Sequence, residues 1–358
     1  MHKRPHGSAY YLLGIMIWLL SSQNRTNYFR LCITGGIVLL LSGCASEHSL
    51  HFVKTQRNTP VLLAHRGISQ TFDPNGVTNS TCTATRIYSP KHSLLENTIE
   101  SISASIRLGA SVVEVDVHPT TDGEFAVFHD WTLECRTNGS GRTRDQTMSY
   151  LKSLDIGYGY TADNGKSFPF RGKAIGQMPS LREVLAAFPK QPLLVNIKSN
   201  DPLEGERFAV YLAELPETRR EFIAVYGAEL PINVVRERVP GILTMSRDSL
   251  KSCLIGYLLA GWSGAIPKSC EKTLVLVPIN YSGWLWGWPE TFIRRMESVG
   301  SVVFVAGNYH GGASQGIDSI EELNNLPQGY KGGIWTNELE LISAALSKSN
   351  SSLPNLHP

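Results

Sequence analysis

Residues 114–130, EVDVHPTTDGEFAVFHD, constrain the fold and chemistry of this chain more than any other segment. Residues 112–117 are rich in valine, which favours a strand, and side chains two residues apart in a strand lie on one face. Glu114 and Asp116 therefore project from the same face. Two adjacent carboxylates repel, so an acid pair on an apolar strand indicates a bound cation, and oxygen ligands suit Ca²⁺ or Mg²⁺. Taken alone, an E-x-D pair on a strand is more often a solvated edge or an ion-pair face.

A turn and a second short strand follow this acid pair. Asp122 and Gly123 predict the turn, and residues 125–128 predict an apolar strand that brings His129 and Asp130 to its end. In α/β barrels, catalytic groups collect at strand ends. A single histidine after an apolar run is more often structural, so the combination with the acid pair makes the case for a site.

Another apolar run, residues 61–64, ends in His65, Arg66 and Gly67. The imidazole can transfer a proton, the guanidinium can bind a phosphate through two hydrogen bonds, and glycine permits close backbone approach. These three residue types together indicate phosphate chemistry.

A further run, residues 193–198, carries Asn196 and Lys198 on one face by the same spacing. A neutral oxygen ligand and a cation are thereby expected side by side. A lysine at a strand end can also be only a solvated rim charge.

The remaining apolar runs alternate with helical stretches, which predicts a parallel sheet with crossover connections. They are residues 222–226, 242–245, 274–279, 302–306 and 333–336. Together with the four upstream runs they give nine candidates for the eight strands of a barrel, so one is spurious or accessory. With 358 residues and 42% hydrophobic content the chain can bury one such core. The net charge of +2, without a basic run, gives no indication of nucleic-acid binding.

The motifs HRG, ENT (residues 96–98), EVDV, TTDGEFAVFHD and NIK, in this order over residues 65–198, resemble those of the glycerophosphodiester phosphodiesterase family. The resemblance implies a (β/α)₈ TIM barrel of the α/β class. It also implies hydrolysis of glycerophosphodiesters to glycerol 3-phosphate and an alcohol, by two histidines and a divalent cation.

Carried over by motif, the resemblance also implies a set of site residues. These are His65 and His129 as the acid/base pair, Arg66 and Lys198 at the phosphate, Glu114, Asp116 and Asn196 at the metal, and Glu96 in a further active-site role. It leaves open which histidine is the acid, and whether water or a substrate hydroxyl attacks, the latter giving a cyclic phosphate first.

Two features depart from the family pattern. The family usually has glutamate where Asn196 stands, so the cation would be held by one less negative charge. The segment between Gly67 and Glu96 is much longer than usual. We expect that insertion to form a loop at the rim of the site, although it could be a surface decoration.

The first 44 residues form a targeting segment. Arg25 and Arg30 precede an apolar run, and residues 41–44, LSGC, resemble the lipobox of bacterial lipoproteins, which implies acylation of Cys44. Ala45 then favours the outer membrane, with the protein facing the periplasm. The alternatives are an ordinary cleaved signal or an uncleaved anchor, and an earlier apolar run at residues 10–20 suggests an over-extended start.

After that segment we expect a tether over residues 45–58, a barrel domain over 59–348 and a disordered tail over 349–358. Four further cysteines can pair in three ways, and we favour Cys82 with Cys135 and Cys253 with Cys270. The first pair would pin the long insertion to the segment just after His129.

Three classes of function remain open. The first is a membrane-tethered glycerophosphodiesterase, the second is a phospholipase-D-like or lysophospholipid enzyme, and the third is a weakly active binding protein, suggested by Asn196. The aromatic segment 281–289, YSGWLWGWP, is compatible with a lipid substrate, because its rings could line a pocket, stack on choline or rest at a membrane. It could also pack as an ordinary loop.

Overall fold

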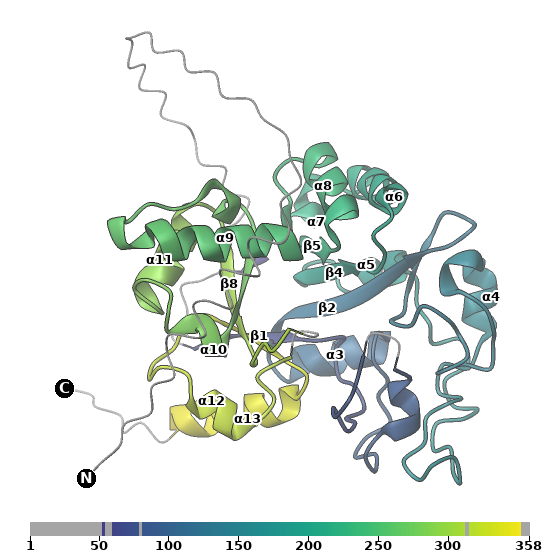
Figure 1. The fold of residues 1–358 in the computed structure, drawn as a ribbon. Helices are drawn as coiled ribbons and strands as arrows, with labels where there is room; N and C mark the ends of the chain where they lie inside the picture. Colours follow the sequence, from purple (N-terminus) through teal and green to yellow (C-terminus); the bar gives the residue numbers. More distant parts are fainter. Residues whose placement is uncertain (1–51, 54–58, 79–80, 312–314, 352–358) are drawn as a thin grey trace. The chain divides into compact units, whose positions relative to one another are not determined.

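The structure is a computed structural model that describes residues 52–53, 59–78, 81–311 and 315–351. Within these residues, eight parallel strands form a nearly closed barrel with helices around it (Figure 1). The barrel strands are β1 (Val61–Ala64), β2 (Ala110–Pro119), β4 (Leu193–Ile197), β5 (Ile223–Gly227), β6 (Leu243–Ser246), β7 (Leu274–Pro278), β8 (Val302–Ala306) and β9 (Gly333–Thr336). They neighbour one another in the order β6-β5-β4-β2-β1-β9-β8-β7, and one bridge from Thr244 to Thr273 links β6 to β7. The expected TIM barrel is confirmed.

The ninth predicted strand is the accessory one. It is β3 (Phe125–Val127), which pairs antiparallel with the end of β2 and forms a hairpin outside the barrel order. Gly123 supplies the left-handed conformation of the turn, and the Asp122 carboxylate accepts a hydrogen bond from the backbone N–H of Met148. The hairpin therefore fixes where β3 ends, two residues before His129.

Helices connect the strands and cover the barrel. They are α3 (Ile99–Arg107), α4 (Met148–Ser153), α5 (Leu181–Ala187), α6 (Pro202–Glu214), α7 (Glu217–Arg220), α8 (Glu229–Arg238), α9 (Arg247–Ala260), α10 (Ile279–Ser282), α11 (Glu290–Ser298), α12 (Ile320–Asn324) and α13 (Leu339–Ser351). Short 3₁₀ turns are η1 (Thr83–Arg86), η2 (Thr143–Asp145), η3 (Gly261–Ser263) and η4 (Lys268–Cys270).

Strand alternation separates two hydrophobic clusters. On β2, Val113, Val115 and Val117 face the helices and join a large outer cluster. Val112 joins an inner cluster with side chains from the other barrel strands and with Phe52. The inward positions further along β2 are occupied by acids rather than apolar residues, so the barrel interior is polar near the carboxyl ends of the strands.

The long insertion lies between Gly67 and Glu96, and a second long segment, the excursion, covers residues 130–180 between His129 and α5. The two segments share a third, smaller hydrophobic core. Ala84, Ile87 and Leu95 of the insertion pack with Leu133 and Phe170 of the excursion. The excursion contains one short α-helix, α4. The disulfide between Cys82 and Cys135 joins the two segments, with their Cα atoms 5.5 Å apart.

The second favoured disulfide, between Cys253 and Cys270, is also present and joins α9 to η4. The targeting segment, Cys44 and most of the tether lie outside the described residues. Helix α13 runs to Ser351, past the domain end expected at 348, and residues 352–358 are again outside. Among the described helices, none has the length and apolarity needed to cross a bilayer.

Candidate active site

Asp116 lies on β2 and is fully buried. Four side-chain nitrogen atoms from neighbouring elements contact its carboxylate. Lys198 Nζ lies 3.3 Å and Asn196 Nδ2 lies 2.9 Å from its Oδ1. Arg66 Nε lies 3.1 Å and Asn97 Nδ2 lies 3.0 Å from its Oδ2. Burial acts to raise the pKa of Asp116, but Lys198 and Arg66 outweigh it and hold that pKa well below its ordinary value. Asp116 is therefore an anion around which cationic groups gather.

Glu114, two residues earlier on the same face, has a different environment. Its Oε1 accepts a hydrogen bond from the Tyr226 hydroxyl at 2.8 Å, and its Oε2 accepts one from the backbone N–H of Arg66 at 3.0 Å. His65 Nε2 lies 3.7 Å from the same Oε2. Burial and the charge of Asp116 raise the pKa of Glu114 to about 8.

The loop after β1 takes an unusual backbone conformation. Arg66 has φ of 62° and Gly67 has φ of 77°, the region that glycine tolerates best. A Cβ atom on Gly67 would lie 2.3 Å from Ser101 Oγ on α3, so only glycine lets the loop rest on the first turn of that helix. The conformation turns the Arg66 N–H toward Glu114 and its guanidinium toward Asp116.

Each residue of the ENT motif has its own task. Glu96 accepts a hydrogen bond from Arg66 at 3.1 Å. Asn97, with φ of 61°, donates to Asp116 through its side chain and accepts from the Asp116 backbone N–H at 3.1 Å. Thr98 caps the N-terminus of α3 by accepting from the backbone N–H of Ser101. The motif thus anchors a helix end and holds two charged site residues.

His65 follows β1, and its ring is held by a chain of hydrogen bonds through Asn337 to Asp318, near the C-terminal end of the barrel domain. Its Nδ1 lies 2.6 Å from Asn337 Oδ1, and Asn337 donates from both its side chain and its backbone to Asp318. This leaves Nε2 facing the acid pair, with 16% of the side chain exposed. Burial and the nearby Arg66 charge lower the pKa of His65 to about 3.

His129 follows β3 and has a carboxylate rather than an amide beside it. Its Nδ1 lies 2.7 Å from Asp130 Oδ1, and the side chain is 18% exposed. Arg136 donates through Nε to the other oxygen of Asp130 at 2.9 Å. Burial and the Arg66 charge lower the pKa of His129. The Nε2 atom of His118, on β2, lies 3.3 Å from the His129 carbonyl oxygen.

All eight residues selected from the sequence belong to one contact network. They are His65, Arg66, Glu96, Glu114, Asp116, His129, Asn196 and Lys198.

The sequence analysis assigned no role to the partners that hold this set: Asn97, Asp130, Arg136, Tyr226, Asp318 and Asn337. Four of these had a usable signal, because Asn97 belongs to the ENT motif, Asp130 follows His129, Tyr226 ends a predicted strand and Asn337 directly follows one.

The donor set fits a divalent cation that prefers oxygen ligands. Glu114 and Asp116 offer carboxylate oxygens from the same face of β2, and burial together with the charge of Asp116 raises the pKa of Glu114. Asn196 donates its amide nitrogen to Asp116, and its side-chain oxygen would be the atom that it offers to a cation. In the described part of the chain, no three His, Cys, Asp or Glu side chains cluster in metal-binding geometry. The fit therefore depends on two acids and one amide.

Comparison with known proteins identifies the family. A model of the glycerophosphoryl diester phosphodiesterase family matches residues 65–253, more than half of the chain. The chain belongs to this family. Family members generally depend on a divalent cation.

Curated relatives agree with this membership. A glycerophosphodiester phosphodiesterase of Caldanaerobacter subterraneus is 37% identical over 103 residues, covering 29% of this chain and 39% of the relative. One from Bacillus subtilis is 30% identical over 151 residues, covering 41% and 48%. A human lysophospholipase D is 30% identical over 137 residues, covering 37% and 40%. The chain thus spans less than half the length of these relatives.

Solved structures support the fold of this family member. The glycerophosphoryl diester phosphodiesterase domain of a Mycobacterium tuberculosis protein aligns with a TM-score of 0.56 at 16% identity, covering 81% of this chain and 99% of the other. A glycerophosphodiester phosphodiesterase from Agrobacterium tumefaciens aligns with a TM-score of 0.50 at 18% identity, covering 80% and 100%.

We expect Glu114 to make stability fall with rising pH when divalent cations are chelated. Because its pKa is raised from 4.5 to about 8, the folded protein holds a proton there that the unfolded chain has released. This contribution to the free energy of unfolding is present at low pH and is lost as pH rises toward 8. Denaturant titration of wild type and Glu114→Gln measures it at about pH 5 and about pH 8.

The difference in free energy of unfolding, wild type minus Glu114→Gln, should be smaller at about pH 8 than at about pH 5. The exposed Glu237→Gln is the matched control. A difference for Glu114→Gln that is the same at both pH values would show that this carboxyl titrates normally.

Proposed function

We propose that this protein hydrolyses glycerophosphodiesters to glycerol 3-phosphate and an alcohol. The observation that carries the proposal is the pair of histidines beside two cationic side chains. His65 and His129 both have Nδ1 occupied by a hydrogen-bond partner, so both offer Nε2 for proton transfer. Arg66 and Lys198 are each partly exposed and beside the buried Asp116. Membership of the phosphodiesterase family supports the same reaction.

The two histidines differ in how readily they hold a proton. His129 is paired with the carboxylate of Asp130, which stabilises an imidazolium, whereas His65 is paired with the neutral amide of Asn337. Burial and Arg66 keep the pKa of His65 at about 3. We therefore assign His129 as the general acid that protonates the leaving alcohol oxygen, and His65 as the general base that activates the nucleophile.

The phosphate is bound by the two cationic side chains. Arg66 presents a planar guanidinium held by Glu96 and Asp116, and Lys198 adds a point charge. Both neutralise charge that develops on the phosphoryl oxygens. Glu114, Asp116 and Asn196 would hold the divalent cation, Ca²⁺ or Mg²⁺, which when bound supplies further Lewis-acid neutralisation of these oxygens.

A second candidate is hydrolysis of lysophospholipids. It is favoured by exposed aromatic side chains in and after α10, which follows the carboxyl end of β7. Tyr281, Trp284 and Trp286 are 36%, 50% and 48% exposed. Such rings suit an acyl chain or a lipid surface, and one curated relative is named a lysophospholipase D.

We expect release of glycerol 3-phosphate from glycerophosphocholine that stops when a chelator removes the cation. His65→Ala and His129→Ala should each reduce kcat by about 10²- to 10⁴-fold, the usual value of general acid–base catalysis. A 4-nitrophenyl diester has a leaving group that needs no proton. On that substrate His129→Ala should recover most of its activity, and His65→Ala should not.

His92→Ala, at a partly buried histidine outside the site, is the matched control for these variants. Recovery by His65→Ala instead would reverse the two roles. Turnover on lysophosphatidylcholine but not on glycerophosphocholine would favour the second candidate. No turnover of either by the folded protein with any cation would leave a binding protein and contradict the proposal.

We also propose that a lipid on Cys44 tethers the enzyme to the bacterial cell envelope, on the strength of the LSGC sequence. Cys44→Ala should move the protein from the detergent phase to the aqueous phase in detergent partitioning. Cys32→Ala, in the same segment, should not. Equal partitioning of both variants into detergent would contradict the anchor.

A further inference from the structure

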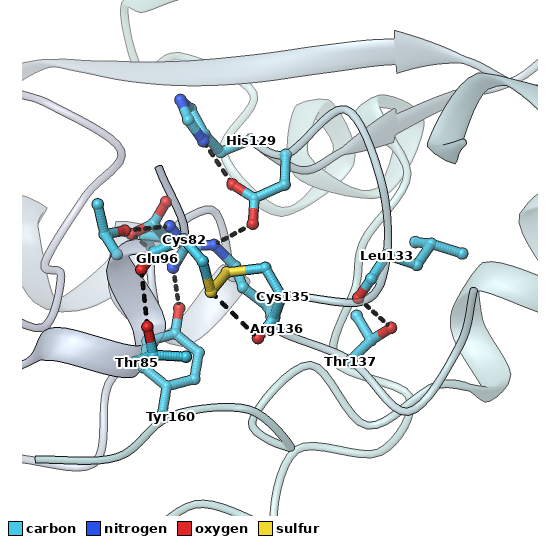
Figure 2. Close-up of a disulfide and its surroundings, with 11 residues drawn as sticks. Cys82, Thr85, Glu96, His129, Leu133, Cys135, Arg136, Thr137 and Tyr160 are labelled. Atoms are coloured by element: carbon cyan, nitrogen blue, oxygen red, sulfur yellow. Dashed lines mark hydrogen bonds and ion pairs between the residues drawn. A yellow bond between two sulfur atoms is a disulfide. The ribbon is translucent and has the colours of Figure 1, made fainter. Parts of the chain in front are cut away.

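Arg136 is a buried cation that connects two parts of the site. It is 2% exposed and lies between two carboxylates (Figure 2). Its Nε donates to Asp130 Oδ2 at 2.9 Å, and its Nη1 lies 3.2 Å from Glu96 Oε2. Its Nη1 also donates to the Tyr160 hydroxyl, and its Nη2 donates to Thr83 Oγ1 at 2.8 Å. Every nitrogen of the guanidinium thus has a partner.

A disulfide holds both ends of this arrangement. Cys135 directly precedes Arg136, and Cys82 directly precedes its partner Thr83, so one covalent bond ties the arginine backbone to the residue that its side chain contacts. The excursion closes over the same place: a Cβ atom on Gly159 would lie 1.9 Å from the Cys135 carbonyl oxygen. The insertion and the excursion therefore meet at Arg136.

We propose that Arg136 is a positioning residue for both His129 and Arg66, and that the Cys82–Cys135 disulfide keeps it in place. This inference rests on the proposed function. By holding Asp130 Oδ2, Arg136 leaves Oδ1 directed at His129 Nδ1, which fixes the ring with Nε2 toward the substrate.

The second connection runs through Glu96 to the phosphate-binding side. Glu96 uses Oε2 for Arg136 and Oε1 for the guanidinium of Arg66. Burial acts to raise the pKa of Glu96 and of Asp130, but the Arg136 charge outweighs it and lowers both. Both carboxylates therefore stay anionic, and one buried guanidinium orients the proton donor and the phosphate ligand together.

The chain offers a matched control for loss of a disulfide. The bond between Cys253 and Cys270 lies in a separate cluster with Tyr257 and Phe292. Removing it tests the general cost of losing a cross-link without touching Arg136. Its loop is shorter, with a sequence separation of 17 against 53.

The experiment compares four variants of the full chain: Arg136→Lys, Thr83→Val, C82S/C135S and C253S/C270S. Arg136→Lys keeps the positive charge but loses the planar guanidinium. Thr83→Val removes one hydrogen bond to Arg136. It is the milder variant, and it tests the inference even when C82S/C135S fails to fold. Thermal melts select folded samples. The first readout is nuclear magnetic resonance of ¹⁵N-histidine-labelled protein without substrate, with the His129 signals assigned by their absence in His129→Ala. The second readout is kcat and KM on glycerophosphocholine.

We expect Arg136→Lys and C82S/C135S to weaken the hydrogen-bonded Nδ1–H signal of His129 and to lower kcat by about 10- to 100-fold. Thr83→Val should change both in the same direction but less. C253S/C270S should leave the His129 signal unchanged and kcat within about twofold. Wild-type His129 signals in folded Arg136→Lys and C82S/C135S would overturn the inference.

The two readouts separate this inference from the proposed function. If the wild type turns over no glycerophosphodiester, the proposed function fails, while the His129 signals still decide whether Arg136 positions that ring. If C253S/C270S lowers kcat as much as C82S/C135S, the effect is general destabilisation and the positioning role is wrong.

Discussion

The buried carboxylate of Asp116 is the interaction on which the rest of the site depends. A carboxylate without exposure is costly unless it is paired and hydrogen-bonded. Here Arg66, Asn97, Asn196 and Lys198 meet that requirement, and they come from the loop after β1, the N-terminus of α3 and the end of β4. Because β1 and β4 are the two barrel neighbours of β2, the strand order of the barrel brings these donors to one point.

The same carboxylate compensates backbone strain. Arg66 and Asn97 both have φ near 60°, which costs about 1–3 kcal/mol for each residue other than glycine. Both direct their side chains at Asp116 Oδ2, so the strained conformations are retained where they make charged contacts. The consequence is a guanidinium fixed before a substrate arrives, which lowers the reorganisation needed to stabilise charge on a phosphoryl group.

Sequence reasoning succeeded where information was local. Period-two alternation placed Glu114 with Asp116, and strand ends located His65 and His129, because these relations span a few residues. It failed for partners held by long-range packing: the Asn337 that orients His65 is 272 residues away. Arg136 was missed although its neighbour Cys135 was paired correctly, because a disulfide predicted from cysteine count does not indicate which side chains it supports. The role of Asn196 as an oxygen ligand stays a prediction; its amide nitrogen donates to Asp116.

The central claim is that one network around Asp116 arranges two histidines and two cationic side chains about a single phosphate. The most direct test is a crystal structure of the protein with glycerol 3-phosphate and a divalent cation. The account predicts phosphate oxygens within hydrogen-bonding distance of Arg66 and Lys198, with Nε2 of both His65 and His129 facing the phosphate. A phosphate bound without contact to either cationic side chain, or with His129 turned away, would contradict it.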